Sequence, residues 1–119
     1  KIPAAKLYGF VGGRLDHQIL LLGDLLRLSQ DHAFSFEIFD KQELRMEIIP
    51  PGDFARSFSG AFSLFTLYEQ KVLFKGDCRY PLNKEYPQLI RPFSTNGLSN
   101  FCASRIELKT EKSICVYYV

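Results

Sequence analysis

Residues 9–17 hold the side chains of this sequence that are best suited to chemistry. They include two adjacent glycines, an arginine, an aspartate and a histidine: Gly12, Gly13, Arg14, Asp16 and His17. The segment follows an apolar run and opens a leucine-rich one, so these residues are expected at the start of a helix. Free backbone amides and the positive end of the helix dipole favour phosphate there. Arg14 can form paired hydrogen bonds with phosphate oxygens, and Asp16 can hold a divalent metal ion or a hydroxyl.

The glycine-rich segment has a simpler interpretation as well. Glycines are common where a strand leads into a helix, and an acidic residue in the first helical turn complements the dipole. The segment has neither the Lys-Ser/Thr pair of a Walker sequence nor the GxGxxG spacing of a dinucleotide-binding turn. His17 has no nucleophile near it in the sequence, which gives a catalytic triad little support. A phosphate site and an ordinary helix start both remain open at this point.

The elements around this segment predict an α/β unit. Apolar residues dominate from Leu15 to about Gln30 and leave a narrow polar stripe, which predicts a helix that is covered over most of its surface. Strands are predicted before and after it, over 6–11 and 33–39. Such a helix needs a sheet of several strands. We therefore expect residues 1–40 to form the C-terminal part of an α/β domain whose N-terminal part is absent from this sequence.

The remainder of the sequence, residues 41–119, predicts short β-strands. Apolar and charged residues alternate over 44–48, and the run Pro50-Pro51-Gly52-Asp53 is typical of a turn. Further strands are predicted over 61–68, 71–75, 105–108 and 113–119. Their spacing favours an antiparallel β-sandwich. The expected fold class is thus mixed α/β plus all-β, with a strand-helix-strand remnant followed by the sandwich.

Composition excludes several classes of protein. The 119 residues are 46% hydrophobic and 24% charged, with a formal net charge of +2, which is ordinary for a globular chain and does not favour a nucleic-acid partner. The apolar stretches are too short to span a bilayer, so no membrane association is expected. The three cysteines are widely spaced and form no CxxC pair, which argues against a disulfide framework or a zinc site and favours the cytoplasm.

Two later segments have side chains suited to binding a small molecule. In residues 76–82, Tyr80 could offer its ring face to a flat or cationic ligand, although a tyrosine packed at the end of an edge strand explains the pattern as well. Residues 95–100 form a polar run that is most simply a turn between strands. Its hydroxyl and amide groups could equally hold a small polar ligand.

The order of these segments is more specific than any one of them. Gly-Gly-Arg-Leu-Asp-His, Phe-Ser-Leu-Phe-Thr-Leu, Gly-x-x-x-Tyr-Pro-Leu and Gly-Leu-Ser-Asn follow one another along the chain. This order resembles the thiamine pyrophosphokinase family, from about Leu7 to Val119, and corresponds to the C-terminal part of the family's polypeptide. The resemblance implies an N-terminal α/β domain (here residues 1–40), a thiamine-binding β-sandwich (residues 41–119), and a homodimer with active sites between its subunits.

The resemblance also implies a reaction and roles for individual residues. The reaction transfers a pyrophosphoryl group from Mg²⁺-bound ATP to the hydroxyl of thiamine, giving thiamine diphosphate and AMP. Arg14 and Asp16 would be catalytic, with Arg14 on phosphate and Asp16 beside the metal ion or the thiamine hydroxyl. Gly12, Gly13 and His17 would complete the phosphate and nucleotide turn. The residues that match the thiamine pocket are Tyr80, Leu98, Ser99 and Asn100.

The sequence departs from the family pattern in places. Phe101 replaces an acidic residue that often follows the Ser-Asn pair, and Gly76 lies one residue farther from Tyr80 than usual. By the same resemblance, most acidic residues of the Mg²⁺·ATP site belong to the N-terminal domain, so these 119 residues are expected to be inactive alone. The alternative function is a non-catalytic β-sandwich that binds a small molecule or mediates dimerisation.

Overall fold

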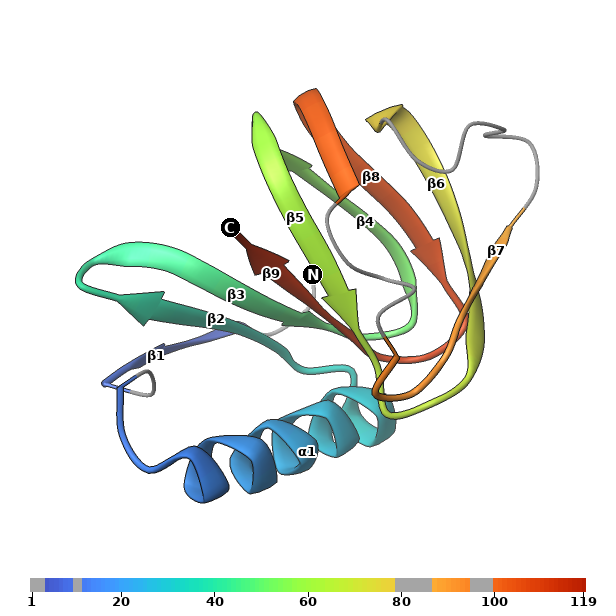
Figure 1. The fold of residues 1–119 in the computed structure, drawn as a ribbon. Coiled ribbons are helices and arrows are strands. Elements are labelled where there is room, and N and C mark those ends of the chain that lie inside the picture. The colour runs from blue at the N-terminus through green and yellow to red at the C-terminus, as the bar shows by residue number, and fades with distance from the viewer. Residues whose placement is uncertain (1–3, 10–11, 79–86, 95–99) are drawn as a thin grey trace.

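The structure is a computed structural model that describes residues 4–9, 12–78, 87–94 and 100–119. This part of the chain is mostly β-sheet with one helix (Figure 1). In chain order the elements are β1 (Ala4–Tyr8), α1 (Leu15–His32), β2 (Ser35–Asp40), β3 (Glu43–Ile49), β4 (Gly52–Ser57), β5 (Gly60–Phe65), β6 (Gln70–Cys78), β7 (Gln88–Ile90), β8 (Asn100–Thr110) and β9 (Ile114–Tyr118).

The strands form a single hydrogen-bonded sheet of mixed direction. Its order is β1-β2-β3-β9-β5-β8-β6-β7, and β4 pairs separately with β8. β1 and β2 are parallel and are joined through α1, as a crossover between parallel strands requires. The other pairings are antiparallel.

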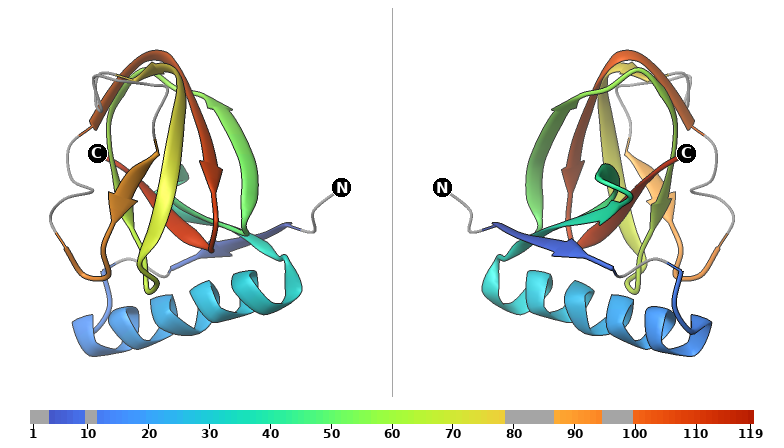
Figure 2. Two further views of the ribbon diagram at one scale, coloured as in Figure 1. Left: turned by 90° about the vertical axis from the view of Figure 1, so that its right-hand side faces the viewer. Right: turned by 90° about the vertical axis from the view of Figure 1, so that its left-hand side faces the viewer.

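The long strand β8 bends the sheet around a hydrophobic core. Its first residues pair with β5, its later residues pair with β4, and most of its length pairs with β6. The strands therefore curve around an enclosed space (Figure 2). Buried side chains from six strands fill that space: Ile49, Phe62, Leu64, Val72, Phe74, Ile90, Cys102, Ile106, Leu108, Ile114, Val116 and Tyr118. This arrangement is consistent with the expected β-sandwich.

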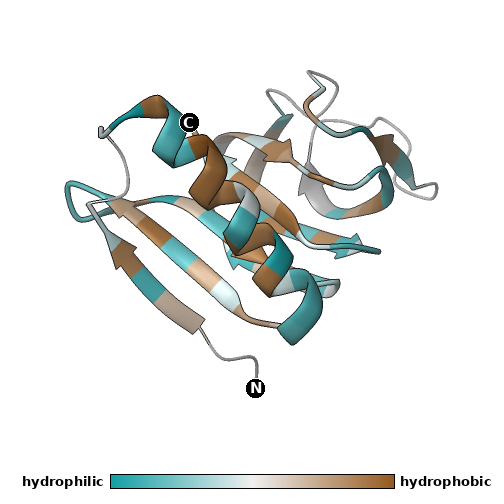
Figure 3. Ribbon diagram, turned by 90° about the horizontal axis from the view of Figure 1, so that it is seen from below, coloured by the Kyte–Doolittle hydropathy of each residue, from teal (hydrophilic) through white to brown (hydrophobic). Residues whose placement is uncertain are grey.

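A second core lies between α1 and the sheet. Leu25 and Leu26 of the helix pack on buried residues of β2, β3 and β9, namely Phe36, Ile38, Met46, Ile48 and Cys115. Seen from below, α1 lies across the sheet and carries apolar residues on its visible face as well (Figure 3). Leu20, Leu21 and Leu28 are 68%, 44% and 41% exposed. The sheet thus covers one side of α1, and further cover from an N-terminal segment remains a prediction.

Hydrogen bonds fix the C-terminal half of α1 to the turn between β8 and β9. The Ser113 hydroxyl donates to the Leu26 carbonyl at 2.7 Å, and the Ser113 amide donates to Gln30 Oε1 at 2.8 Å. Gln70, which is 2% exposed, donates from Nε2 to the Ser113 carbonyl at 3.1 Å. These bonds satisfy polar groups that would otherwise be buried without partners.

Most of the predicted elements are present with shifted boundaries. The helix extends to His32, β3 and β6 contain the predicted strands 44–48 and 71–75, and β8 is much longer than the predicted 105–108. β4 was not predicted, because its first residues, Gly52 and Asp53, were assigned to a turn. β7 was not predicted either, and its three residues are too few to show a periodic pattern.

The expected domain boundary lies between two strands that pair with each other. β2 ends at Asp40 and β3 begins at Glu43, and the two are antiparallel neighbours. The boundary between two domains at residue 40 therefore remains a prediction. Among the described residues, there is no helix with both the length and the apolar character needed to cross a membrane.

Ser113→Ala tests the link between α1 and the β8–β9 turn. The substitution removes a buried donor and leaves the Leu26 carbonyl without it, so we expect the free energy of unfolding to fall by about 1–2 kcal/mol. Chemical denaturation monitored by circular dichroism measures this change. Ser57→Ala, at an exposed position of β4, is the matched control and should alter stability by less than about 0.5 kcal/mol. Equal effects of the two substitutions would show that the Ser113 bond contributes nothing.

Candidate functional site

The glycine-rich turn connects the C-terminal end of β1 to the N-terminus of α1. Gly12 has φ +94°, a conformation that other residues rarely adopt, and no atom lies within 4 Å of the position that a Cβ would occupy. The corresponding space beside Gly13 is empty too, and its φ is not in the positive region. A ligand can therefore approach the backbone closely at both positions.

Arg14 and Asp16 form an ion pair at the start of α1. Arg14 Nη2 lies 2.6 Å from Asp16 Oδ2, and Arg14 Nε donates to Asp16 Oδ1 at 3.1 Å. Both side chains are more than half exposed, so water screens their attraction. Asp16 Oδ1 also accepts a hydrogen bond from the His17 amide at 3.0 Å. Without a ligand, the two charged groups of the turn thus neutralise each other.

A shallow cavity of about 220 Å³ lies beside this turn. Gly9, Gly13, Arg14 and His17 line it, together with Gln18 and Leu21 of the helix. Of the five predicted turn residues, Gly13, Arg14 and His17 line this cavity, and Asp16 is joined to them through its ion pair with Arg14. Arg14 occupies the N-cap position and makes no capping hydrogen bond through its side chain. Apart from the His17 amide, which donates to Asp16, the first helical amides are consequently available to an anion.

The metal-binding prediction for Asp16 depends on ligands from elsewhere. Within residues 4–9, 12–78, 87–94 and 100–119, no group of three or more His, Cys, Asp or Glu side chains is arranged to hold a metal ion. Mg²⁺ is often held by one or two carboxylates together with substrate phosphates and water. Asp16, whose carboxylate also forms the ion pair with Arg14, fits the role of one such carboxylate.

Of the predicted thiamine-binding residues, only Asn100 lies in the described part of the chain. Tyr80, Leu98 and Ser99 lie outside it. Asn100 begins β8, is 6% exposed, and accepts a hydrogen bond from the Phe101 amide through Oδ1 at 2.7 Å. It does not line the cavity beside the glycine-rich turn.

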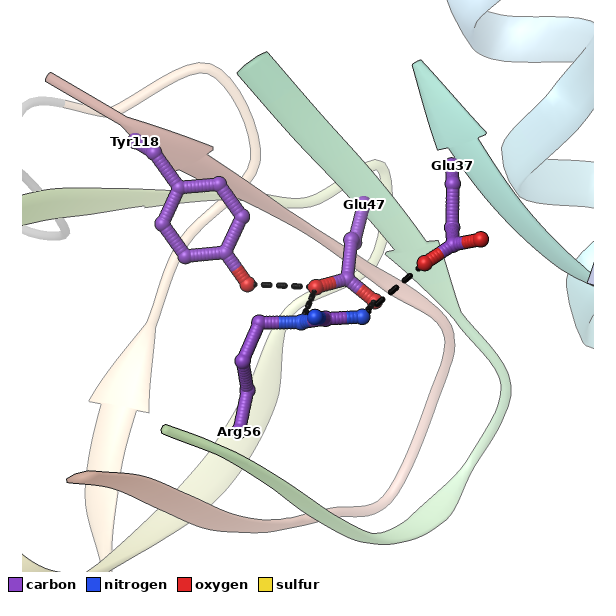
Figure 4. Close-up of polar contacts among 4 residues, drawn as sticks. All are labelled: Glu37, Glu47, Arg56 and Tyr118. Carbon is purple, nitrogen blue, oxygen red and sulfur yellow. Dashed lines mark hydrogen bonds and ion pairs between the residues drawn. The ribbon is translucent and has the colours of Figure 1, made fainter. Parts of the chain in front are cut away.

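A buried charged cluster joins β4 to β2, β3 and β9 (Figure 4). Arg56 of β4 forms ion pairs with Glu47 of β3 and Glu37 of β2, and its Nη2 donates to an oxygen of each at 3.0 Å. The Tyr118 hydroxyl donates to Glu47 Oε1 at 2.6 Å. The side chain of Glu47 is 4% exposed and that of Arg56 is 34% exposed. The cation thus compensates a carboxylate that would be costly to bury alone.

The cluster changes the acidity of two of its members. Burial tends to lower the pKa of Arg56, but the hydrogen bond and charge of Glu47 outweigh it, and the net pKa is raised. Burial and the charge of Glu47 both raise the pKa of Tyr118 far above its ordinary value. Tyr118 therefore remains a neutral hydrogen-bond donor. Nothing in this arrangement makes Tyr118 or Arg56 a proton-transfer group near neutral pH.

The sequence analysis did not identify this cluster. Glu47 lies in a segment where charged and apolar residues alternate, a pattern typical of a strand with one solvated face. Both faces of β3 are buried near Glu47, since residues 46–49 are all buried. The sequence feature that could have indicated a buried ion pair is Arg56, a cation that follows a predicted turn and had no assigned role.

Comparison with solved structures gives the fold. Thiamine pyrophosphokinase from Bacillus subtilis superposes with a TM-score of 0.70 and 25% identity over 95% of this chain and 53% of its own. Thiamin pyrophosphokinase from Candida albicans has a TM-score of 0.68 and 11% identity, covering 98% and 45%. A thiamin pyrophosphokinase family protein from Enterococcus faecalis has a TM-score of 0.61 and 16% identity, covering 96% and 55%.

These matches cover nearly all of this chain and about half of each matched structure. No protein-family model matches the chain, and no curated protein matches its sequence. The chain has a thiamine pyrophosphokinase-like fold. The resemblance inferred from the sequence motifs is thereby confirmed at the level of the fold.

A double-mutant cycle tests the Arg56–Glu47 interaction. Arg56→Met leaves Glu47 buried without its cation, and we expect a loss of about 2–3 kcal/mol in the free energy of unfolding, less than for a fully buried pair because Arg56 is partly exposed. Glu47→Gln in the Arg56→Met background should restore part of that loss. Urea denaturation of the wild type, both single variants and the double variant gives the coupling energy. Additive effects would contradict the pairing.

Alkaline pH should destabilise the fold through Cys115 and Tyr118. Burial raises the pKa of Cys115 from 9.0 to about 12, and Tyr118 shifts in the same direction. The unfolded chain therefore releases these protons first, so the free energy of unfolding falls as pH rises above about 9. Tyr118→Phe should make this fall shallower. Tyr117→Phe removes the same hydroxyl from an exposed neighbouring ring and serves as the control; an equal change in slope would refute the assignment to Tyr118.

Proposed function

We propose that this chain is part of a thiamine pyrophosphokinase, which transfers the pyrophosphoryl group of ATP to the hydroxyl of thiamine. The observation that carries the proposal is the coincidence of fold and motif. Structures named thiamine pyrophosphokinases match 95% or more of the chain, and the Gly-Gly-Arg-Leu-Asp-His motif lies at the junction of β1 and α1, where a phosphate can bind. Since the chain spans about half of each matched structure, the activity is proposed for the full-length protein.

The reaction exchanges one phosphorus–oxygen bond for another. The thiamine hydroxyl oxygen bonds to the β-phosphorus of ATP, the bond from that phosphorus to the oxygen retained by the α-phosphate breaks, and AMP leaves while the hydroxyl proton is lost. Catalysis of such a transfer depends mainly on the position of the phosphates and the neutralisation of their charge. Mg²⁺, when bound, would supply part of that neutralisation.

The residues of the turn have distinct roles in this proposal. The Arg14 guanidinium binds phosphate oxygens, and its planar fork suits two of them at once. Asp16 binds the metal ion or the thiamine hydroxyl. Gly12 allows the tight turn, Gly13 allows phosphate to approach the backbone, and His17 lines the adjacent cavity. The Arg14–Asp16 contact uses Arg14 Nε and Nη2, so other N–H groups of the guanidinium remain for phosphate while the pair is intact.

The thiamine pocket is proposed at Tyr80, Leu98, Ser99 and Asn100. A tyrosine ring beside the positively charged thiazolium is favourable by roughly 0.5–2 kcal/mol, depending on desolvation. The family resemblance implies that the pocket of one subunit works with the turn of another. The functional unit in this proposal is therefore a homodimer.

A non-catalytic binding module is the alternative. One observation favours it: the described residues contain no cluster of carboxylates for a metal ion, and Asp16 is paired with Arg14. Such a module would bind thiamine without transferring a pyrophosphoryl group. An activity assay on the full-length protein distinguishes the two functions, because the proposed enzyme requires additional acidic residues outside this chain.

Gly13→Ala tests whether a ligand contacts the backbone of the turn. The added methyl group meets no atom within 4 Å, so we expect the thermal unfolding temperature to remain unchanged. The methyl group would obstruct a phosphate at this position, so the affinity for a non-hydrolysable ATP analogue should fall by tenfold or more, about 1.4 kcal/mol. Titration calorimetry on the full-length protein measures this affinity. Unchanged affinity would exclude close contact at Gly13.

Charge substitutions at the turn test its role in nucleotide binding. Arg14→Gln should weaken binding of the ATP analogue, and Asp16→Asn should weaken it when Mg²⁺ is present, since each removes a predicted contact. Asp24→Asn and Arg27→Gln are matched controls, because Arg27 and Asp24 form a similarly exposed ion pair, also at 2.6 Å, farther along the same helix. If the substitutions at both pairs act alike, the turn has no specific role. Calorimetry with thiamine on the same variants reports separately on the thiamine pocket.

A further inference from the structure

An apolar cavity of about 340 Å³ lies where α1 meets β3, β5 and β9 of the sheet. Its walls come from four elements that are distant in sequence: Leu22 of α1, Met46 of β3, Phe65 of β5, and Cys115 and Tyr117 of β9. It is separate from the cavity beside the glycine-rich turn, and the two have no lining residue in common.

None of the described residues that line the cavity has a charged side chain. The polar residues among them are Ser63, Ser94, Cys115 and Tyr117. Burial raises the pKa of Cys115 to about 12, so this thiol is neutral at physiological pH. An ion placed here would lose its hydration without gaining a partner of opposite charge. The wall chemistry therefore selects an uncharged ligand and disfavours phosphates and the thiazolium cation.

Two of the side chains that line the cavity are exposed to solvent: Tyr117 is 40% exposed and Val119 is 69% exposed. Phe93 is 67% exposed, and its ring meets the ring of the lining residue Phe65 edge-on with centroids 4.9 Å apart. Phe93 has φ +49°, a left-handed conformation that a bulky residue rarely adopts. Strain of this kind is concentrated at ligand-binding sites, and here it occurs at a residue that contacts the cavity wall.

The size of the cavity suits a small aromatic molecule. An apolar cavity of about 150 Å³ in another protein holds benzene, so a space about twice as large accommodates two fused rings. Aromatic side chains of Phe65 and Tyr117 are positioned to contact such rings, and serine hydroxyls lie on the same wall. We propose that this cavity binds an uncharged aromatic small molecule of one or two rings, at a site distinct from those for thiamine and ATP.

Met46 provides a direct readout, because it is the only methionine of the chain and lines the cavity. In the full-length protein labelled with ¹³C at the methionine methyl groups, the resonance of Met46 is assigned by its loss in the Met46→Leu variant, and indole is the probe. Binding predicts a saturable change in the chemical shift of this resonance as indole is added. No change, or a change that grows linearly without saturation, would overturn the proposal.

Variants that fill the cavity separate binding from nonspecific effects. Ser63→Leu and Cys115→Met each add volume to a different wall, and either should abolish the saturable shift while circular dichroism remains native. Ser57→Leu makes the same change as Ser63→Leu at an exposed position of β4 and should leave binding intact. Persistence of the shift in a folded cavity-filling variant would contradict the proposal.

Competition with thiamine tests whether the site is separate from the proposed substrate site. An excess of thiamine should leave the indole-induced shift of Met46 unchanged, because the cavity offers no negative charge to the thiazolium. Displacement of indole by thiamine would overturn the assignment of a distinct site. This outcome is independent of the proposed catalytic function, since it requires no turnover.

Discussion

Burial of β3 and β9 on both faces is the constraint on which the rest of the structure depends. Side chains alternate along β9: Cys115 packs under α1, whereas Ile114, Val116 and Tyr118 face the core enclosed by the other strands. The two cores therefore share β3 and β9. These shared strands fix the position of α1, and with it the glycine-rich turn at the start of the helix, relative to the curved sheet.

The charged cluster follows from the same constraint. β3 passes from the layer beneath α1 into the curved sheet, and Glu47 consequently has no route to solvent. Arg56 of β4 and the Tyr118 hydroxyl satisfy its two oxygens, and Glu37 accepts a further hydrogen bond from Arg56 Nη2. A buried ion pair adds little net stability compared with apolar packing, but removal of one partner is costly. Loss of one partner from this cluster is therefore more costly than the small net contribution of the intact pair would indicate.

Local patterns predicted the helix and most of the strands, because these depend on residues close in sequence. The leucine periodicity from Leu15 gave α1, and alternation gave β3. β4 was missed because Gly52 and Asp53 favour a turn locally, while pairing with β8, more than 50 residues away, makes them part of a strand. The partners of Glu47 and the apolar cavity also come from several distant strands, and no local pattern encodes such contacts.

The candidate site likewise has features that local sequence predicted and contacts that it did not predict. The sequence identified the turn, since glycines and charged residues adjacent to one another carry local information, and the structure places Gly13, Arg14 and His17 around one cavity. It did not show that Arg14 and Asp16 would neutralise each other. The order of motifs along the chain predicted the thiamine pyrophosphokinase-like fold, which structural comparison confirmed, because motif order reflects the arrangement of the whole chain rather than one segment.

The proposed pyrophosphoryl transfer to thiamine can be tested through the identity of its products. The full-length protein would be incubated with ATP, Mg²⁺ and thiamine, and the phosphorus-containing products followed by ³¹P NMR. We expect thiamine diphosphate and AMP in equal amounts, with no AMP when thiamine is omitted. Formation of ADP in place of AMP, or thiamine binding without any product, would contradict it.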